Sequence, residues 1–234
     1  MTAVIQQLID KQDTFEIVRD KVALILAEES AQQQQLAIDD GKDPALWKLR
    51  VFTERTNPWE FLRTNDGKPP ALLENRAPVV CVWFEASNID QRASQTIDRQ
   101  QMEATFHLDV YGIGVTEILP GRTGQIAGDE VAAKEAQRGA RLVRNILMAD
   151  SYVTLGIDRA LGLIGQRHIS TIQSFQPEFA SQNAWQLAGL RLALQVKLSE
   201  LGPQTPAVIL EELSAIVRNE NGEILIDALF ESTP

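Results

Sequence analysis

The stretch from Gln101 to Gly114, QMEATFHLDVYGIG, alternates apolar and polar side chains almost without interruption. A period of two residues is typical of a β-strand with one buried and one polar face. The predicted buried face carries Met102, Ala104, Phe106, Leu108 and Val110. The predicted polar face carries Glu103, Thr105, His107, Asp109 and Tyr111. The strand exceeds the usual length of about five or six residues, and long strands commonly project as hairpins or continue a sheet across a subunit boundary.

The rest of the sequence predicts helices and further strands around this one. An apolar period of 3.6 residues predicts an N-terminal helix with a capping box at Asp13 and Glu16, and a long central helix over 129–149. Further strands are predicted at residues 79–86, 152–157, 167–176 and 185–201. We expect an α+β fold in which a mostly antiparallel sheet of about four main strands packs against the two helices.

The chain divides into a body and an appendix. Residues 1–202 are interpreted as a single α+β domain, with residues 42–78 as a long inserted loop because turn signals recur through them. Residues 203–234 follow as a C-terminal extension, in which Asn221–Gly222 predicts a β-hairpin. A loop as long as 42–78 is usually functional or bound to a partner, so a binding module that holds a ligand in this loop is one hypothesis.

The composition argues against several classes of protein. The 32 acidic and 22 basic side chains give a net charge of −10, unlike a surface that binds nucleic acid or anionic membrane throughout. The single cysteine, Cys81, permits no internal disulfide, and its apolar surroundings predict a packed, unreactive thiol. No apolar run approaches the roughly 20 residues that span a bilayer, and the N-terminus lacks the basic leader of a signal peptide. We expect a protein of the reducing cytosol.

One pair of side chains has the spacing of metal ligands. His107 and Asp109 share a face of the predicted strand, and the only other histidine, His168, lies in another predicted strand. The three together would fit a metal-dependent enzyme. The alternative is that His107 and Asp109 are solvated members of a polar sheet face. The sequence contains no Gly-x-Ser-x-Gly nucleophile motif, and we predict no catalytic residues, metal or cofactor.

The predicted central helix carries an arc of cations although the chain is acidic. The arc consists of Lys134, Arg138, Arg141 and Arg144. Like charges at helical spacing destabilise a helix slightly unless acidic groups meet them. This side of the helix is therefore either solvated or part of a subunit interface. In the interface hypothesis, Glu103 and Asp109 of the polar strand face and the acidic C-terminal tail of a neighbouring copy face the cations.

The order of these elements resembles a known family. An N-terminal helix and a long loop precede an apolar strand, and the strand QMEATFHLDVYG is followed by the helix AAKEAQRGARLVRNIL. The body closes with ISTIQSFQPEF and WQLAGLRLALQVKLSEL. Over about residues 1–201, this pattern resembles the tail-terminator (tail-completion) proteins of tailed bacteriophages and related contractile particles. The resemblance lies in the pattern and not in an invariant motif.

The resemblance implies a structural virion protein and not an enzyme. Proteins of this family form a ring, usually a hexamer, that caps the finished tail tube, stops its polymerisation and presents a surface to the head-side connector. The implied partners are further copies of the chain, the tail tube protein and the connector or neck proteins, with a tail sheath as a further candidate. DNA would pass through the lumen without binding, because acidic side chains repel phosphate.

The implied location is the tail or neck of the virion, after assembly in the host cytoplasm. Neck and head-completion proteins have related architectures, so another neck protein of the same particle is the alternative to a tail terminator. No contact with a membrane is implied.

Overall fold

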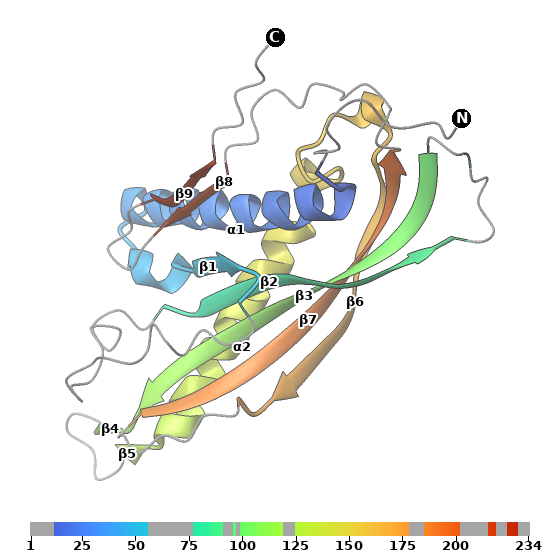
Figure 1. Ribbon diagram of the computed structural model, residues 1–234. Helices are drawn as coiled ribbons and strands as arrows, with labels where there is room; N and C mark the ends of the chain where they lie inside the picture. Colours follow the sequence, from blue (N-terminus) through green and yellow to red (C-terminus); the bar gives the residue numbers. More distant parts are fainter. Residues whose placement is uncertain are drawn as a thin grey trace.

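In the computed structural model, two α-helices pack against one face of a five-stranded mixed sheet (Figure 1). The α+β class predicted from the sequence is therefore confirmed. Among the residues that the structure describes, no helix is both long and apolar enough to cross a membrane. The described residues are 12–55, 77–90, 96, 99–118, 125–177, 185–201, 215–218 and 224–228.

The sheet has the strand order β1-β2-β3-β7-β6. Its strands are β1 (Arg50–Thr53), β2 (Val79–Ile89), β3 (Arg99–Val115), β6 (Ile164–Phe175) and β7 (Trp185–Leu201). β1 runs parallel to β2, and all other neighbours are antiparallel. The sheet thus differs from the predicted four-stranded one by β1, which lies in the segment interpreted as an irregular loop. Four residues are too few to display a period of two, so the pattern did not reveal this strand.

The strand predicted at residues 152–157 is wrong. This segment follows the short 3₁₀ helix η4 (Asp150–Tyr152) as a series of turns, and Leu155 and Gly156 adopt φ angles of 53° and 70°. Such left-handed angles are incompatible with an extended strand. Leu155 is nevertheless fully buried, so its apolar character reflects packing of a turn against the core. A second 3₁₀ helix, η5 (Arg159–Leu161), leads into β6.

Helix α1 (Thr14–Asp39) begins at the predicted capping box. The backbone N–H of Asp13 donates to the carboxylate of Glu16 at 3.0 Å. Phe15 stacks on Phe84 of β2 with 4.2 Å between the ring centroids, which attaches the start of the helix to the sheet. The chain then passes through the 3₁₀ helix η1 (Pro44–Trp47) into β1. The part of the helix predicted before residue 12 lies outside the described residues.

Helix α2 (Gly128–Leu147) packs closely on β3 and β7. Glycines in β3 permit the close approach: a Cβ atom added to Gly112 would lie 2.1 Å from the carbonyl oxygen of Ala132. One added to Gly114 would lie 2.1 Å from the carbonyl oxygen of Gly128. Backbone therefore meets backbone, and the glycines that end the opening sequence stretch serve helix packing.

The main core lies between the two helices and the sheet. Its fully buried side chains include Phe106, Leu108 and Val110 of β3, Leu192 and Leu194 of β7, Val18, Val22 and Leu26 of α1, and Val143 and Leu147 of α2. Each such side chain stabilises the fold by about 1.5–3 kcal/mol relative to exposure. The apolar face predicted for β3 therefore faces both helices.

Arg167 of β6 joins this strand to the end of α2. Its guanidinium donates hydrogen bonds to the carbonyl oxygens of Leu147, of Ala149 at 3.0 Å and of Tyr152 at 2.7 Å. Carbonyls at the C-terminal end of a helix have no partner within the helix. Arg167 supplies that partner and so fixes the position of β6 relative to α2.

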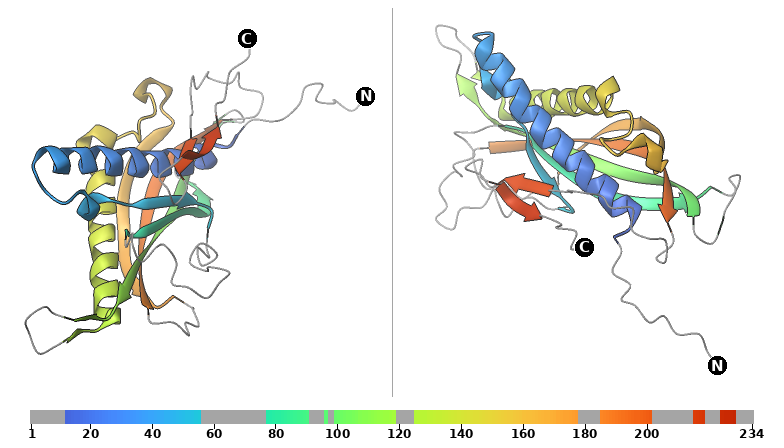
Figure 2. Two further views of the ribbon diagram at one scale, coloured as in Figure 1. Left: turned by 90° about the vertical axis from the view of Figure 1, so that its left-hand side faces the viewer. Right: turned by 90° about the horizontal axis from the view of Figure 1, so that it is seen from above.

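Two small antiparallel sheets complete the described chain. β4 (Glu117–Ile118) pairs with β5 (Gln125–Ile126), and β8 (Ala215–Arg218) pairs with β9 (Ile224–Ala228). Figure 2 shows β8 and β9 beside α1. The turn predicted at Asn221–Gly222 lies outside the described residues, and the hairpin appendix over 203–234 stays a prediction.

Candidate functional site

Both helices lie on the same side of the sheet, so in the described part of the chain the other side carries no helix (Figure 2). We call this other side the helix-free face. Strand pairing sets its rows, in which residues of β3 stand opposite residues of β7. The pairs are Glu103 with Lys197, Thr105 with Gln195, His107 with Ala193, Asp109 with Arg191 and Tyr111 with Gly189. This is the strand face that the sequence predicts to be polar.

Asp109 lies at the centre of a hydrogen-bonded network on this face. Asp109 is only 1% exposed, and its carboxylate accepts bonds from Arg191 Nε at 2.6 Å and Arg191 Nη2 at 2.8 Å. Trp83 of β2 donates its indole N–H to the same carboxylate at 3.1 Å. The interpretation of Asp109 as a solvated side chain is therefore wrong, and its contact with a neighbouring copy stays a prediction. A buried carboxylate needs an internal cation, and Arg191 supplies it.

The guanidinium of Arg191 lies over two aromatic rings. Its central carbon is 5.1 Å from the centroid of the Trp83 ring and 5.4 Å from that of Phe175. Phe175 in turn meets the ring of Tyr111 edge to face at 5.6 Å. Hydrogen bonding to Asp109 raises the pKa of Arg191, and burial raises the pKa of the Tyr111 hydroxyl. Cation–π contacts and a bidentate ion pair thus hold the same side chain.

His107 is buried beside this network and is only partly satisfied. Its Nε2 lies 2.9 Å from a carboxylate oxygen of Glu85, whereas its Nδ1 is buried without a hydrogen-bond partner. Trp83 packs edge to face against the imidazole at 4.6 Å. Burial lowers the pKa of His107, and the nearby charge of Arg191 lowers it further, although Glu85 and Asp109 act in the opposite direction. The neutral imidazole is therefore favoured, with its Nε2–H donating to Glu85.

The three residues of the metal hypothesis do not come together. His107 lies on β3, opposite Ala193 of β7. His168 lies on β6, which is on the other side of β7. The carboxylate of Asp109 is occupied by Arg191. Within the described ranges, no three His, Cys, Asp or Glu side chains lie close enough together to hold a metal ion.

Cys81 packs within an apolar cluster, as the sequence predicts. It is fully buried next to Phe52 and Tyr111, and burial raises the pKa of its thiol to about 12. The thiol is therefore protonated at neutral pH and is not a nucleophile.

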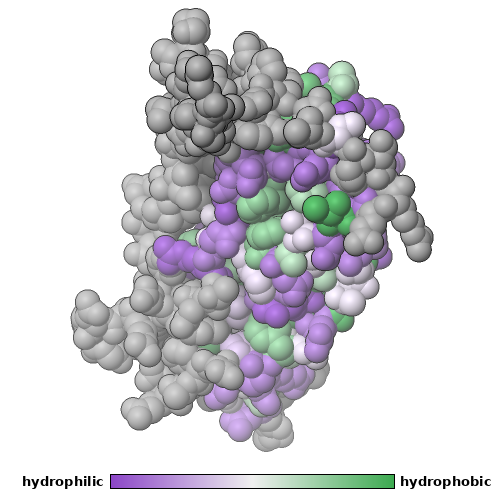
Figure 3. Space-filling view, turned by 45° about the vertical axis from the view of Figure 1, so that its right-hand side comes forward, coloured by the Kyte–Doolittle hydropathy of each residue, from purple (hydrophilic) through white to green (hydrophobic). Residues whose placement is uncertain are grey.

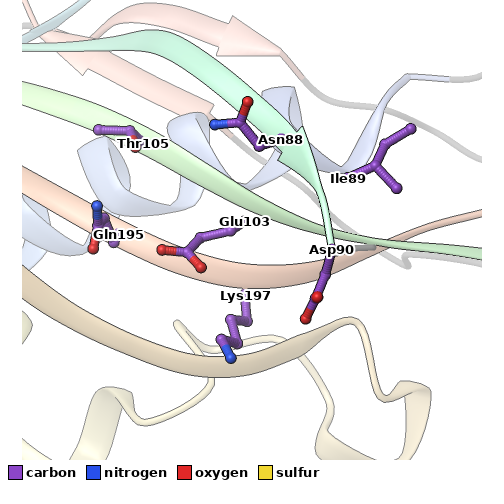
Figure 4. A pocket seen from close by; sticks show the side chains of 7 residues that line it. All are labelled: Asn88, Ile89, Asp90, Glu103, Thr105, Gln195 and Lys197. Carbon is purple, nitrogen blue, oxygen red and sulfur yellow. The ribbon is translucent and has the colours of Figure 1, made fainter. Parts of the chain in front are cut away.

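An open hollow of about 480 Å³ lies at one end of the helix-free face (Figure 4). Polar side chains of β3, β7 and the C-terminal end of β2 with the residue after it line most of it, and Ile89 lies beside them. The polar lining consists of Asn88, Asp90, Glu103, Thr105, Gln195 and Lys197. Glu103 stands opposite Lys197, so the hollow carries both signs of charge side by side. Such a surface suits contact with another polar protein surface better than binding of an apolar ligand.

The predicted cation arc on α2 separates into two pairs. Lys134 bonds to Glu130, and Arg138 bonds to Glu135 at 2.6 Å and to the carbonyl oxygen of Leu46. Arg141 and Arg144 are exposed, and neither forms an ion pair with another described residue. Acidic residues of the same helix thus offset the repulsion between Lys134 and Arg138, but not the repulsion between Arg141 and Arg144.

The sequence matches no protein-family model, and a search of curated proteins finds no significant match. Sequence reasoning also missed the network around Asp109. Arg191 was recognisable as a polar-face residue of its strand, but its position opposite Asp109 depends on the register between two distant strands. The alternation of each strand gives the face of a side chain and not its partner.

Proposed function

We propose that the protein is a structural subunit of a ring that caps the tail tube of a bacteriophage, ends tube polymerisation and joins the tail to the head-side connector. The observation that carries this proposal is the one-sided architecture of the sheet (Figure 2). Helices cover one face, and the other presents the polar hollow between β2, β3 and β7. A subunit of this form suits the wall of a ring, because it offers different surfaces to neighbours on its different sides.

The chemistry of the helix-free face supports a binding role. Asp109, its most deeply buried carboxylate, is bound by Arg191 and Trp83 and is not available as a metal ligand. The aromatic and charged contacts around it make this part of the sheet rigid instead. A wall held in this way suits the structural role of a ring subunit.

The proposed partners follow from this role. They are further copies of the chain in a hexameric ring, the tail tube protein, the head-side connector or neck proteins, and a tail sheath where the tail is contractile. The net charge of −10 supports a lumen through which DNA passes without being retained. Residues 1–202 would form the ring body, and the loop 42–78 and the extension 203–234 with its hairpin would be additions to it.

Measurement of native mass, together with negative-stain images, tests the proposal. Purified protein is measured alone and after mixing with tail tubes, and tube length is followed while tube protein polymerises in its presence. We expect a ring-sized species and tubes that stop growing with the protein at one end. A protein that stays monomeric and never associates with tube ends would contradict the proposal.

A further inference from the structure

The five-stranded sheet ends in two open edges. β6 forms one edge, and none of its 12 residues is buried; Ile172 is 52% exposed. The other edge belongs to β2 beyond the end of β1. The carboxylate of Glu54, just after β1, accepts the backbone N–H of Phe84. Residues 85–89 continue beside β3, but on their outer side no strand of the described chain pairs with them.

Neither edge carries proline or lysine, two residues that normally prevent strand pairing, although the register shifts in β2 between Phe84 and Ala86 and at two places in β6. The sequence of β6, IGQRHISTIQSF, contains no proline, no lysine and no acidic residue. Within the described residues, no backbone hydrogen bond reaches the outer side of β6 or of residues 85–89. Figure 3 shows hydrophilic and hydrophobic residues interspersed over the described surface of one side of the molecule. Long unprotected edges invite association, so proteins that retain them commonly pair them with a partner strand.

The two edges lie at the same level along the strands, and their directions are compatible with antiparallel pairing. The row Ala86, Thr105, Gln195, His168 crosses the sheet from one edge to the other. The row Ile89, Met102, Leu198, Ile164 also crosses the sheet; it lies three residues further along β2, β3 and β7 but four residues along β6, where the register shifts. Because β2, β3, β7 and β6 alternate in direction, β2 and β6 run oppositely. A β6 strand placed beside β2 of another copy therefore extends the same antiparallel pattern.

We propose that β6 of one copy pairs with residues 85–89 of β2 in the next copy, so that the sheet continues from subunit to subunit. This inference rests on the proposed ring, because a head-to-tail contact between two different edges closes into a ring or runs on as a filament. The register that keeps the first row in line places His168 beside Ala86, and Gly165 beside the exposed Ile89. The charges of the two edges are also compatible, because β6 has no acidic residue that would repel the exposed Glu85 on the edge of β2.

A second copy is the occupant that fits these edges. Each copy brings both edges, in equal number and opposite direction, so every edge is paired when the chain assembles with itself. Pairing of β6 with β6 across a twofold axis would leave residues 85–89 open in every subunit. A foreign strand on β6 would leave the same edge unpaired.

Cysteine cross-linking tests the contact directly. The native Cys81 is replaced by alanine, and the exposed Ala86 and His168 are then changed to cysteine, alone and together. A short bismaleimide tolerates small differences in register. We expect the double variant to give a ladder of dimers, trimers and larger species that ends at the ring size. Each single variant should stay monomeric on a denaturing gel, and a mixture of the two single variants should give dimers only.

A matched control places the second cysteine on the other layer of the molecule. Gln137→Cys on the exposed side of α2, combined with His168→Cys, should give no ladder. Dimers from His168→Cys alone would show pairing across a twofold axis and overturn the inference. A ring of full native mass without a ladder would overturn the strand pairing and leave the ring intact. Monomers at every concentration, with no cross-link, would overturn both.

Discussion

The two faces of the sheet are built on the same strands but held by different forces. On the helix-covered face, Phe106, Leu108 and Val110 are fully buried against apolar side chains. On the helix-free face, the intervening residue Asp109 is buried just as deeply, although it is an acid held by Arg191. Apolar packing depends on the volume that each side chain fills, whereas a buried ion pair leaves an uncompensated charge when one partner is lost. On the helix-free face, therefore, the hydropathy of a residue does not predict whether that residue is buried.

The largest loss of stability is expected from a methyl group inserted between α2 and β3. Gly112→Ala places a methyl group where only 2.1 Å separates it from the carbonyl oxygen of Ala132, so the helix must move. We expect a loss of about 3 kcal/mol in the free energy of unfolding, measured with urea. Gly165→Ala in β6 is the matched control, because its added methyl meets nothing closer than 3.4 Å. Equal stability of the two variants would show that α2 does not rest on β3 in this way.

A smaller loss of stability is expected when the ion pair on the helix-free face is removed. Arg191→Leu leaves Asp109 buried without its cation, while the neighbouring rings retain an apolar contact. The side chain of Arg191 is 37% exposed, so water offsets part of the cost, and we expect a loss of about 2 kcal/mol. Adding Asp109→Asn should restore part of it, because the double variant carries no unpaired charge. Additive losses in this double-mutant cycle would contradict the network.

These two variants also separate what the sequence could predict from what it could not. The period of two in β3 was sufficient to identify Phe106, Leu108 and Val110 as core residues, because facing is a local property of a strand. The same period predicted that Asp109 is exposed to solvent, because its partner Arg191, which allows its burial, lies 82 residues away in the chain. β1 and the left-handed turn at Leu155 were missed for related reasons. A four-residue strand has no measurable period, and a buried turn resembles a strand in hydropathy.

The next prediction concerns the pH dependence of the helix-free face. Burial lowers the pKa of folded His107 below its ordinary value of 6.5, so the unfolded chain binds the proton more readily. The stabilisation from His107 is therefore complete above pH 6.5 and is lost as the pH falls from 6.5 towards the lower pKa of the folded state. His107→Gln should flatten the decline of unfolding free energy between pH 7.5 and the acid side, compared with wild type. His168→Gln, which removes the other histidine at an exposed position of β6, is the matched control substitution.

The smallest effect on stability is expected on the outer side of α2, which belongs to neither face of the sheet. Arg141 and Arg144 are exposed without an ion pair to any described residue, so Arg141→Glu with Arg144→Glu should change the free energy of unfolding by less than about 0.5 kcal/mol. Arg138→Glu should cost more, about 1–2 kcal/mol, because Arg138 bonds to Glu135 and to the carbonyl oxygen of Leu46.

Assembly should respond in the opposite order. If acidic side chains of a neighbouring ring protein meet α2, reversal at Arg141 and Arg144 shifts the native mass towards smaller species, and more so at low salt. Circular dichroism and sizing of the same samples separate this result from unfolding. Unimpaired assembly would show that the cations are solvated. The sheet edges would then carry the contacts between copies, and the helix layer would only support the sheet.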